Sequence, residues 1–205
     1  MSPTARLAAA IVAIVCWVGL AVQLQASTAL MGSLGGAIVA MLRYFTVIGN
    51  LFAACVYSAA ALGSRRAATP FVIGGVTLTM LLIGIVYALL LNGLLELSGG
   101  AALADLLLHK VTPALAALYW LVIGPKAGLK WRDPLLWALL PLVYFVYALA
   151  RAGVEGIYAY PFLNVATLGW GQVLLTALAM AIGFLVVGVL LVWIGRLIDP
   201  RRRQA

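Results

Sequence analysis

Long apolar stretches, separated by short polar or glycine- and proline-containing segments, follow one another along nearly the whole chain. A helix needs about 20 apolar residues to cross the hydrocarbon core of a bilayer. Stretches of about this length predict six spans, at Leu7–Gln25, Tyr44–Gly63, Phe71–Leu91, Asp105–Ile123, Leu135–Ala150 and Gln172–Leu197. These spans leave no room for a soluble domain, so residues 1–205 are predicted to form one all-α, six-helix transmembrane bundle.

The composition supports a membrane rather than water as the solvent. Of the 205 residues, 66% are hydrophobic and 9% are charged, whereas a soluble domain is about half apolar and a quarter charged. A water-soluble fold of this size could not hide so much apolar surface. The net charge of +8 would suggest nucleic acid as a partner of a soluble protein, but no RNA- or DNA-binding pattern is present. We predict a multi-pass protein of the inner (plasma) membrane.

The basic residues predict the orientation of the bundle. If the N-terminus is cytoplasmic, ten of the 13 basic residues fall on the inner side, namely Arg6, Arg65, Arg66, Lys126, Lys130, Arg132, Arg196, Arg201, Arg202 and Arg203. Three fall on the outer side: Arg43, Lys110 and Arg151. This bias follows the positive-inside rule and predicts that both termini are cytoplasmic. The first span could instead be a cleaved signal peptide, although its apolar part is long for one.

Two polar residues, on the second and fourth predicted spans, fall at a similar depth. Both spans would enter from the outer side, near Arg43 and near Asp105. At a rise of 1.5 Å per residue, Thr46 lies about 4.5 Å beyond Arg43, and His109 lies about 6 Å beyond Asp105. The sequence therefore predicts that Thr46 and His109, the single histidine, share the outer third of the bilayer.

The spacing of neighbouring polar residues predicts that these two helices turn polar faces into the bundle. Thr46 and Asn50 are four residues apart, as are Asp105 and His109, so each pair lies on one helical face. An ionisable side chain inside a span rarely faces lipid. We expect a polar chamber between the helices that opens outward, with the basic residues of the outer side near its mouth.

Such a chamber would suit nucleophilic catalysis. A threonine hydroxyl becomes an effective nucleophile when a base accepts its proton, and the neutral imidazole of His109 could serve Thr46 in this way. Asp105 could hold the imidazole in one tautomer. Asn50 could donate a hydrogen bond to a developing oxyanion.

Two features near the rim of the chamber are candidates for binding a ligand. Arg43 or Arg151 could hold an anionic group such as a fatty-acid carboxylate. In the loop Tyr158–Asn164, Pro161 restricts Tyr160 to extended geometry, and the aromatic side chains would suit a cap over the chamber. The alternative for this loop is an aromatic anchor at the membrane interface, without contact to a ligand.

Each candidate residue also has a purely structural interpretation. A threonine in a transmembrane helix usually donates to a carbonyl of its own helix, which is the alternative for Thr46. Asn50 could join two helices, and Asp105 could be favoured by the dipole at a helix start. His109 could be a structural donor, and arginines near an interface extend toward lipid headgroups.

No metal or organic cofactor is predicted. A single histidine excludes bis-histidine haem ligation, and no cysteine cluster suits an iron–sulfur centre. Cys16 and Cys55 lie in apolar runs without metal-ligand spacing, so both are expected to be buried, inert thiols.

Four stretches carry a resemblance to a known family: RYFTVIGNLF, LLHKVTPALAALYWL, PLLWALLPLVYFVYALARAG and GIYAYPFLNVATLGWGQVL. They resemble the bacterial Pr-six-Pr family of six-pass membrane proteins, relatives of the animal androgen-induced and androgen-dependent TFPI-regulating proteins. The similarity covers most of the chain from Met41 onward, and the segment NGLLELSGGAALAD falls outside the recognised pattern.

The resemblance implies an activity. Animal members look like membrane hydrolases that cleave fatty acid esters of hydroxy fatty acids with a threonine and a histidine from separate spans. By position in the matching stretches, these residues correspond to Thr46 and His109. The resemblance thus implies a threonine hydrolase with a lipid ester or fatty acid as its ligand, among membrane lipids and without a nucleic-acid partner.

Two functions of other classes remain open from the residues alone. In a small proton-coupled transporter, Glu96, Asp105 and His109 could relay protons, as intramembrane ionisable groups often do. A non-enzymatic, lipid-binding bundle is the second alternative.

Overall fold

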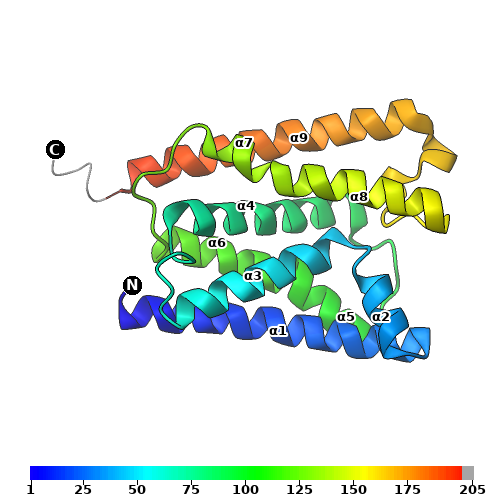
Figure 1. The fold of residues 1–205 in the computed structure, drawn as a ribbon, viewed down its shortest axis with the longest axis horizontal. Helices are drawn as coiled ribbons and strands as arrows, with labels where there is room; N and C mark the ends of the chain where they lie inside the picture. Colours follow the sequence, from blue (N-terminus) through cyan, green and yellow to red (C-terminus); the bar gives the residue numbers. More distant parts are fainter. Residues whose placement is uncertain (200–205) are drawn as a thin grey trace.

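The computed structural model describes residues 1–199, and all regular elements among them are helical (Figure 1). The α-helices are α1 (Pro3–Met31), α2 (Leu34–Met41), α3 (Phe45–Ala61), α4 (Pro70–Val86), α5 (Gly99–Leu106), α6 (Thr112–Val122), α7 (Asp133–Trp137), α8 (Leu139–Glu155) and α9 (Val165–Leu197). Two single π-helical turns, η1 (Tyr87–Leu91) and η2 (Leu107–Val111), continue α4 and α5, and η3 (Pro161–Leu163) is a short 3₁₀ turn. Arg201, Arg202 and Arg203, predicted on the cytoplasmic side, lie outside the described residues.

Five helical segments are long and apolar enough to cross a membrane: Pro3–Met31, Pro70–Leu91, Gly99–Val122, Asp133–Glu155 and Val165–Leu197. The bent pair of α2 and α3 would be a sixth. The prediction of an all-helical, multi-pass membrane protein is therefore confirmed, with five or six spanning helices.

The second predicted span is where sequence and structure differ most. The helix α3 begins at Phe45, and α2 precedes it at an angle of 95°. Tyr44 between them has an extended backbone (φ −99°, ψ 130°), so Arg43 lies in the turn and not on the helix that carries Thr46. The prediction that Thr46 lies about 4.5 Å beyond Arg43 along one helix is therefore wrong, because the two residues do not share a helix.

The fourth and sixth predicted spans begin earlier than the sequence suggested. The helix that contains Asp105 begins at Gly99, so the prediction that Asp105 is favoured by the dipole at a helix start is wrong. The last helix begins at Val165, where the Asn164 side chain accepts from the Thr167 N–H as an N-cap. Gly169 (φ 73°, ψ 160°) introduces a kink before the long straight part of α9.

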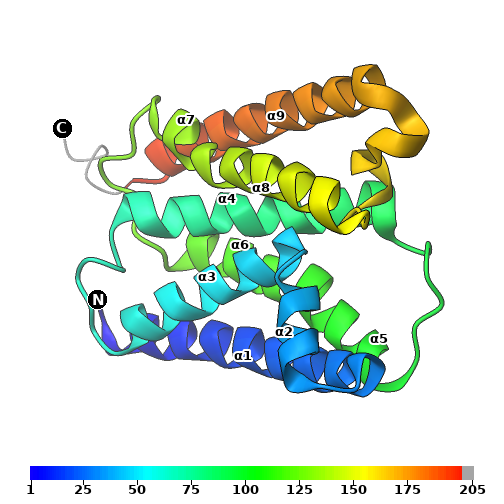
Figure 2. The ribbon, with the colours of Figure 1, turned by 45° about the vertical axis from the view of Figure 1, so that its right-hand side comes forward.

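The helices form a flat bundle with α4 near its centre (Figures 1 and 2). The helices α1 and α3 lie on one side of α4 and α6, whereas α8 and α9 lie on the other. Residues 73–80 of α4 are all buried, which no other spanning helix matches over so long a run. The start of α1 and the end of α9 lie at the same end of the bundle (Figure 1).

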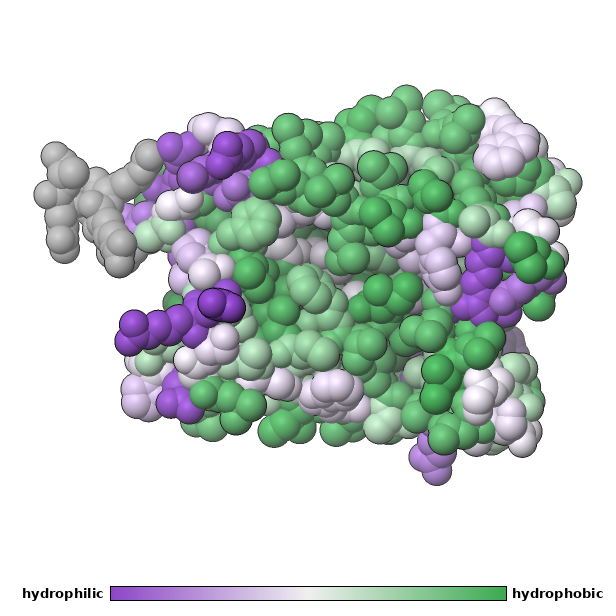
Figure 3. All heavy atoms as spheres, in the orientation of Figure 1, coloured by the Kyte–Doolittle hydropathy of each residue, from purple (hydrophilic) through white to green (hydrophobic). Residues whose placement is uncertain are grey.

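The surface has the pattern of a membrane protein. On the face seen in Figure 3, a continuous apolar belt crosses the middle of the molecule, and hydrophilic residues gather at its two ends. Large apolar side chains such as Leu118, Val122 and Val143 are more than half exposed. Exposed apolar surface of this extent is unfavourable in water and favourable in lipid, so the belt marks the membrane-facing part.

Glycines allow α3, α4 and α6 to approach one another closely, as small residues do in membrane bundles. A Cβ atom at Gly49 of α3 would lie 2.6 Å from Ile83 Cδ1 of α4. A Cβ atom at Gly84 of α4 would lie 3.2 Å from Pro113 Cβ and 3.6 Å from the carbonyl oxygen of His109. The close approach at Gly84 brings the end of α4 against the π-turn that carries His109.

Candidate active site

The Thr46 hydroxyl and the His109 imidazole, predicted from separate spans, meet in the structure. Thr46 Oγ1 lies 3.1 Å from His109 Nε2. Thr46 is 6% exposed, and the His109 side chain is 19% exposed. The predicted contact between the two residues is therefore present, with the hydroxyl buried in the bundle and the imidazole partly exposed.

The position of Thr46 in its helix explains why its hydroxyl is directed to His109. Thr77 and Thr79, in the middle of α4, donate to the carbonyls of Ile73 and Gly75, four residues earlier in the same helix. Thr46 is the second residue of α3, so the carbonyl four positions earlier belongs to the turn before the helix. The back-bonded alternative for Thr46 does not describe the structure.

Asp105 orients the imidazole. Its Oδ1 lies 3.0 Å from His109 Nδ1, and its backbone oxygen lies 3.2 Å from the same nitrogen. Because both Asp105 atoms are acceptors, the network assigns the proton to Nδ1. The lone pair of Nε2 then faces the Thr46 hydroxyl, so Asp105, His109 and Thr46 form a linear arrangement of acid, base and hydroxyl.

Tyr87 completes this cluster and was not predicted from the sequence. Its hydroxyl donates to Asp105 Oδ2 at 2.5 Å. Its ring stacks on the His109 imidazole, with 4.4 Å between ring centroids and 20° between the planes. At the end of an apolar run, such a tyrosine resembles an interfacial anchor, and only its pairing with a distant helix reveals another role.

Both aromatic members of the cluster lie on π-turns. Tyr87 is the first residue of η1, and His109 is the middle residue of η2. A π-turn accommodates an extra residue in a helix and is frequent at functional sites. The Thr112 hydroxyl donates to the Leu107 carbonyl at 2.7 Å, five residues earlier, and thereby stabilises η2.

Asn50 joins the helix of Thr46 to the π-turn of His109. Its Nδ2 donates to the carbonyl oxygen of Thr46 at 2.8 Å and to that of Leu108 at 3.1 Å. Both amide hydrogens are used, and the residue is fully buried. The structure therefore shows the interhelical link that was the alternative for Asn50. Donation to an oxyanion stays a prediction and would require one of these two bonds to break.

Tyr160 lies at the start of α3, beside Thr46. The Thr46 N–H donates to the Tyr160 hydroxyl oxygen at 3.4 Å. Burial raises the pKa of Tyr160, and hydrogen bonds from Thr46 and from the Phe45 N–H offset this only in part, so the phenol is neutral at physiological pH. The extended backbone predicted before Pro161 is confirmed (φ −139°, ψ 148°).

Arg43 and Arg151 both bind Glu155. Arg43 Nη2 lies 2.8 Å from Glu155 Oε2, and Arg151 Nε lies 2.7 Å from Glu155 Oε1. Arg151 also donates to the Val39 carbonyl and the Tyr147 hydroxyl, so the group ties α8 to α2. Glu155 was not predicted from the sequence, and its carboxylate is the one that both arginines bind in the structure.

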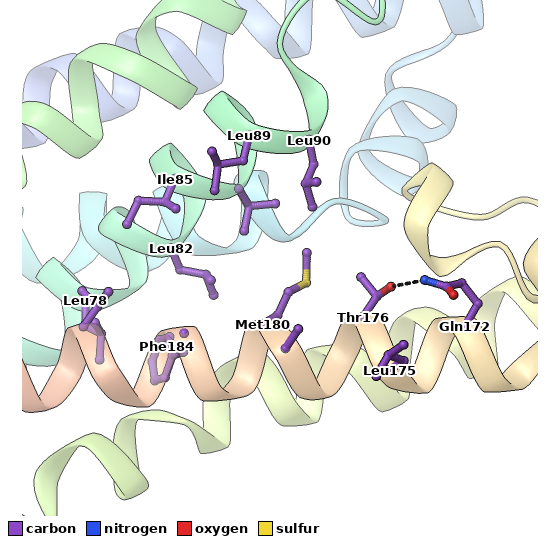
Figure 4. A pocket seen from close by; sticks show the side chains of 14 residues that line it. Leu78, Leu82, Ile85, Leu89, Leu90, Gln172, Leu175, Thr176, Met180 and Phe184 are labelled. Atoms are coloured by element: carbon purple, nitrogen blue, oxygen red, sulfur yellow. Dashed lines mark hydrogen bonds between the residues drawn. The ribbon is translucent and has the colours of Figure 1, made fainter.

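An apolar groove of about 420 Å³ lies between α4 with η1 and α9 (Figure 4). Its lining consists of apolar side chains such as Leu82, Leu89 and Met180, with Gln172 and Thr176 as the polar exceptions. None of its lining residues belongs to the Thr46 cluster, which consists of Thr46, Tyr87, Asp105 and His109. Because α4 and α9 are both long enough to span a membrane, the groove would contact hydrocarbon.

The thiols and possible metal ligands add no further site. Cys16 is buried as expected, but Cys55 is exposed, so it lies on a face of α3 that is turned away from the other helices. Within residues 1–199, no group of three histidine, cysteine or acidic side chains is placed to hold a metal ion.

No protein-family model, curated protein or solved structure matches this chain. Its function therefore has to be inferred from the chemistry of the cluster and from its place in the bundle.

Proposed function

We propose that the protein is a membrane hydrolase that cleaves lipid esters, with Thr46 as the nucleophile and His109 as the general base. The single observation that carries this proposal is the 3.1 Å contact between Thr46 Oγ1 and His109 Nε2, with Asp105 on the opposite nitrogen. Nucleophile, base and orienting acid in this order are the arrangement of hydroxyl-dependent hydrolases. The resemblance to the Pr-six-Pr family points to the same two residues and to fatty acid esters of hydroxy fatty acids.

The reaction has two halves. In the first, Thr46 Oγ1 attacks the ester carbonyl while its proton passes to His109 Nε2, and the leaving alcohol then takes that proton as the C–O bond breaks. In the second, His109 removes a proton from water, which attacks the acyl-threonine. The fatty acid is released and the proton returns to Thr46 Oγ1, so the protein ends unchanged.

Asp105 has a supporting part in both halves. The proton on Nδ1 donates to its carboxylate, which keeps Nε2 free to accept a proton from Thr46. The negative charge of Asp105 also stabilises the imidazolium that forms during each half of the reaction.

We also propose that Arg43 and Arg151 attract the free carboxylate of an acidic lipid ester. Guanidinium groups bind carboxylates in two-pronged geometry. The two arginines share a single carboxylate, that of Glu155, so the group retains one excess positive charge. The carboxylate of such a ligand would bind beside Glu155 or in exchange for it.

The orientation is part of the proposal. We propose that the protein lies in the inner (plasma) membrane with both termini in the cytoplasm, because the basic residues of the sequence are concentrated on that side. The two ends of the described chain lie at one end of the bundle (Figure 1). The Thr46 cluster would then lie in the outer half of the membrane.

A hydrolysis assay with the purified chain in lipid nanodiscs tests the proposal. The substrate is a palmitoyl ester of hydroxystearic acid, and release of palmitic acid is measured. The Thr46→Ala and His109→Ala variants should lose release, whereas Thr46→Ser should retain part of it because the hydroxyl remains. Thr79→Ala, which removes a back-bonded threonine of α4, is the matched control.

The trapped intermediate gives a second test. A fluorophosphonate probe followed by mass spectrometry should label Thr46 and should fail to label the Thr46→Ala variant. Labelling at another residue, or equal hydrolysis by wild type and Thr46→Ala, would reject Thr46 as the nucleophile.

A proton-coupled transporter is the second candidate, because Tyr87, Asp105 and His109 are joined by hydrogen bonds or ring contact. Glu96, the third predicted member of a relay, is exposed in the loop before α5, and no contact among the described residues joins it to this group. A transporter would show His109-dependent flux in liposomes without hydrolysis of the ester.

A further inference from the structure

We infer that Tyr87 is a positioning residue of this site, which holds Asp105 and His109 in the geometry that lets His109 accept the proton of Thr46. The inference rests on the proposed function. It assigns a role to a residue that sequence patterns did not single out, and it makes the site a four-residue arrangement drawn from α3, η1, α5 and η2.

The hydroxyl of Tyr87 fixes the Asp105 carboxylate. Asp105 Oδ1 accepts from His109, and Oδ2 accepts from Tyr87. An aspartate that is held through one oxygen can rotate about its Cβ–Cγ bond, whereas contacts on both oxygens define the plane of the carboxylate. Tyr87 thereby aims Oδ1 at His109 Nδ1 from a different helix, as orienting partners around active-site ligands commonly do.

The ring of Tyr87 acts on the imidazole itself. The two rings are stacked with centroids 4.4 Å apart, and Tyr87 is only 8% exposed. The phenol ring therefore covers one face of the imidazole and prevents it from turning away from Thr46. When His109 takes up a proton, the imidazolium faces the π-electrons of Tyr87, which stabilise a cation.

The backbone places Tyr87 for both contacts. Tyr87 opens η1, and the cap at Asn92 closes this turn through a hydrogen bond from its N–H to the Tyr87 carbonyl. One turn earlier, Gly84 allows α4 to approach Pro113 and the His109 carbonyl. The end of α4 therefore lies against η2, and the two π-turns each contribute one ring to the stack.

The charged groups around this stack define what a change at Tyr87 would alter. The Asp105 carboxylate binds the Tyr87 hydroxyl and His109 Nδ1. Lys110 Nζ lies 5.3 Å from the centre of the Tyr87 ring. The phenol donates to one negative carboxylate and lies beside one positive ammonium group. Removal of the hydroxyl leaves the carboxylate charge directed more fully at the imidazole.

The Tyr87→Phe variant separates the two roles, because it retains the ring and removes the hydroxyl. With the palmitoyl ester substrate in nanodiscs, kcat should fall about 10-fold to 100-fold, as for other orienting contacts, while KM changes little. The acid limb of the kcat/KM profile should move to higher pH, because Asp105 then favours the protonated imidazole more strongly. Tyr87→Leu, which also removes the ring, should lose more activity than Tyr87→Phe.

Two comparisons exclude a merely structural effect. Tyr57→Phe removes the hydroxyl of another buried tyrosine, which packs on Tyr119 instead of His109, and should keep the wild-type kcat and pH profile. In an Asp105→Asn background, Tyr87→Phe should have almost no further effect, because Tyr87 acts through Asp105 and the two changes are coupled.

The outcomes distinguish this inference from the function on which it rests. If wild type hydrolyses the ester but Tyr87→Phe has the same kcat and the same pH profile, the role of Tyr87 is rejected and the hydrolase stands. Losses that simply add in the double variant reject it as well. If wild type is inactive, or if Thr46→Ala and His109→Ala equal wild type, the proposed function itself fails.

Discussion

At the scale of single residues, the local position of a side chain decides what it can do. Thr46, Thr77 and Thr79 are all buried threonines on helices, but only the two in α4 have a carbonyl of their own helix to bind. Thr46, in the first turn of α3, donates instead to His109 Nε2, on another helical element. A hydroxyl at the start of a buried helix is thus free to bind a group on another helix, whereas a hydroxyl in mid-helix binds a carbonyl of its own helix.

The sequence predicted the pair of Thr46 and His109 and the partner Asp105, because intramembrane polar residues are few and their spacing is informative. It did not predict Tyr87 or Glu155. A tyrosine at the end of an apolar run has the same local pattern whether it faces headgroups or a histidine of another helix. Its role depends on contacts of η1 with α5 and η2 that no local pattern encodes.

We predict that Asp105→Asn lowers kcat about 10³-fold or more, because an amide that donates to Nδ1 favours the tautomer with the proton on Nε2. The thermal midpoint should change little, since the shape of the side chain is retained. The measurement is hydrolysis of the palmitoyl ester with thermal unfolding in parallel. Glu96→Gln, in the exposed loop before α5, is the control, and equal activity of both variants would contradict the tautomer argument.

We predict that Asn50→Leu destabilises the fold by about 2 to 3 kcal/mol. The change removes the amide that donates to the carbonyl oxygens of Thr46 and Leu108. Each buried carbonyl then loses a hydrogen bond, which is unfavourable. Unfolding in a detergent titration measures the effect, with Asn92→Leu in the exposed loop after η1 as the comparison. A stability equal to wild type would mean that Asn50 does not hold the two elements together.

At the scale of elements, interruptions of regular helix define the site. The bend between α2 and α3 lets a helix begin at Phe45, and the turns η1 and η2 direct Tyr87 and His109 toward each other. Hydrophobic periodicity predicts the existence of a span, but one extra residue in a helical turn hardly changes that pattern. This is why the spans were predicted well while α2, the π-turns and the start of α5 were not.

We predict that Thr112→Val weakens the site through η2. The valine keeps the shape of threonine but removes the hydroxyl that binds the Leu107 carbonyl at 2.7 Å. Loss of this bond should lower the free energy of unfolding by about 1 kcal/mol and reduce kcat, because His109 lies on the same turn. Thr79→Val removes a comparable hydrogen bond in regular α-helix and should keep the wild-type kcat. If Thr79→Val lowers kcat as much as Thr112→Val does, the proposed dependence of activity on η2 is contradicted.

At the scale of the whole molecule, α4 joins the two halves of the bundle. The group of α1, α3, α5, η2 and α6 contributes Thr46, Asp105 and His109, and η1, which continues α4, supplies Tyr87. The helices α8 and α9 cover the opposite side (Figure 2) and bring Tyr160 to the start of α3 through their connecting loop. Composition alone predicted a membrane bundle, but the order of helices around α4 required the structure.

Cysteine labelling tests the proposed orientation. The loops around Ser64 and Asn92 lie at opposite ends of α4. In intact cells, a membrane-impermeant maleimide should label Asn92→Cys, whereas Ser64→Cys should react only after permeabilisation. The wild-type chain, with Cys16 buried and Cys55 exposed in the middle of α3, gives the background. The reverse pattern would place the termini outside.

The sharp bend before Phe45 has an electrostatic consequence. A span that crossed the bilayer without interruption would leave its first N–H groups at the surface, where water and salt screen them. Here the new helix begins among other helices, with Thr46 only 6% exposed. The partial positive charge of a helix N-terminus, about half an elementary charge, is therefore largely unscreened near Thr46 Oγ1. In the proposed reaction this charge would stabilise the negative charge that develops as the Thr46 hydroxyl loses its proton.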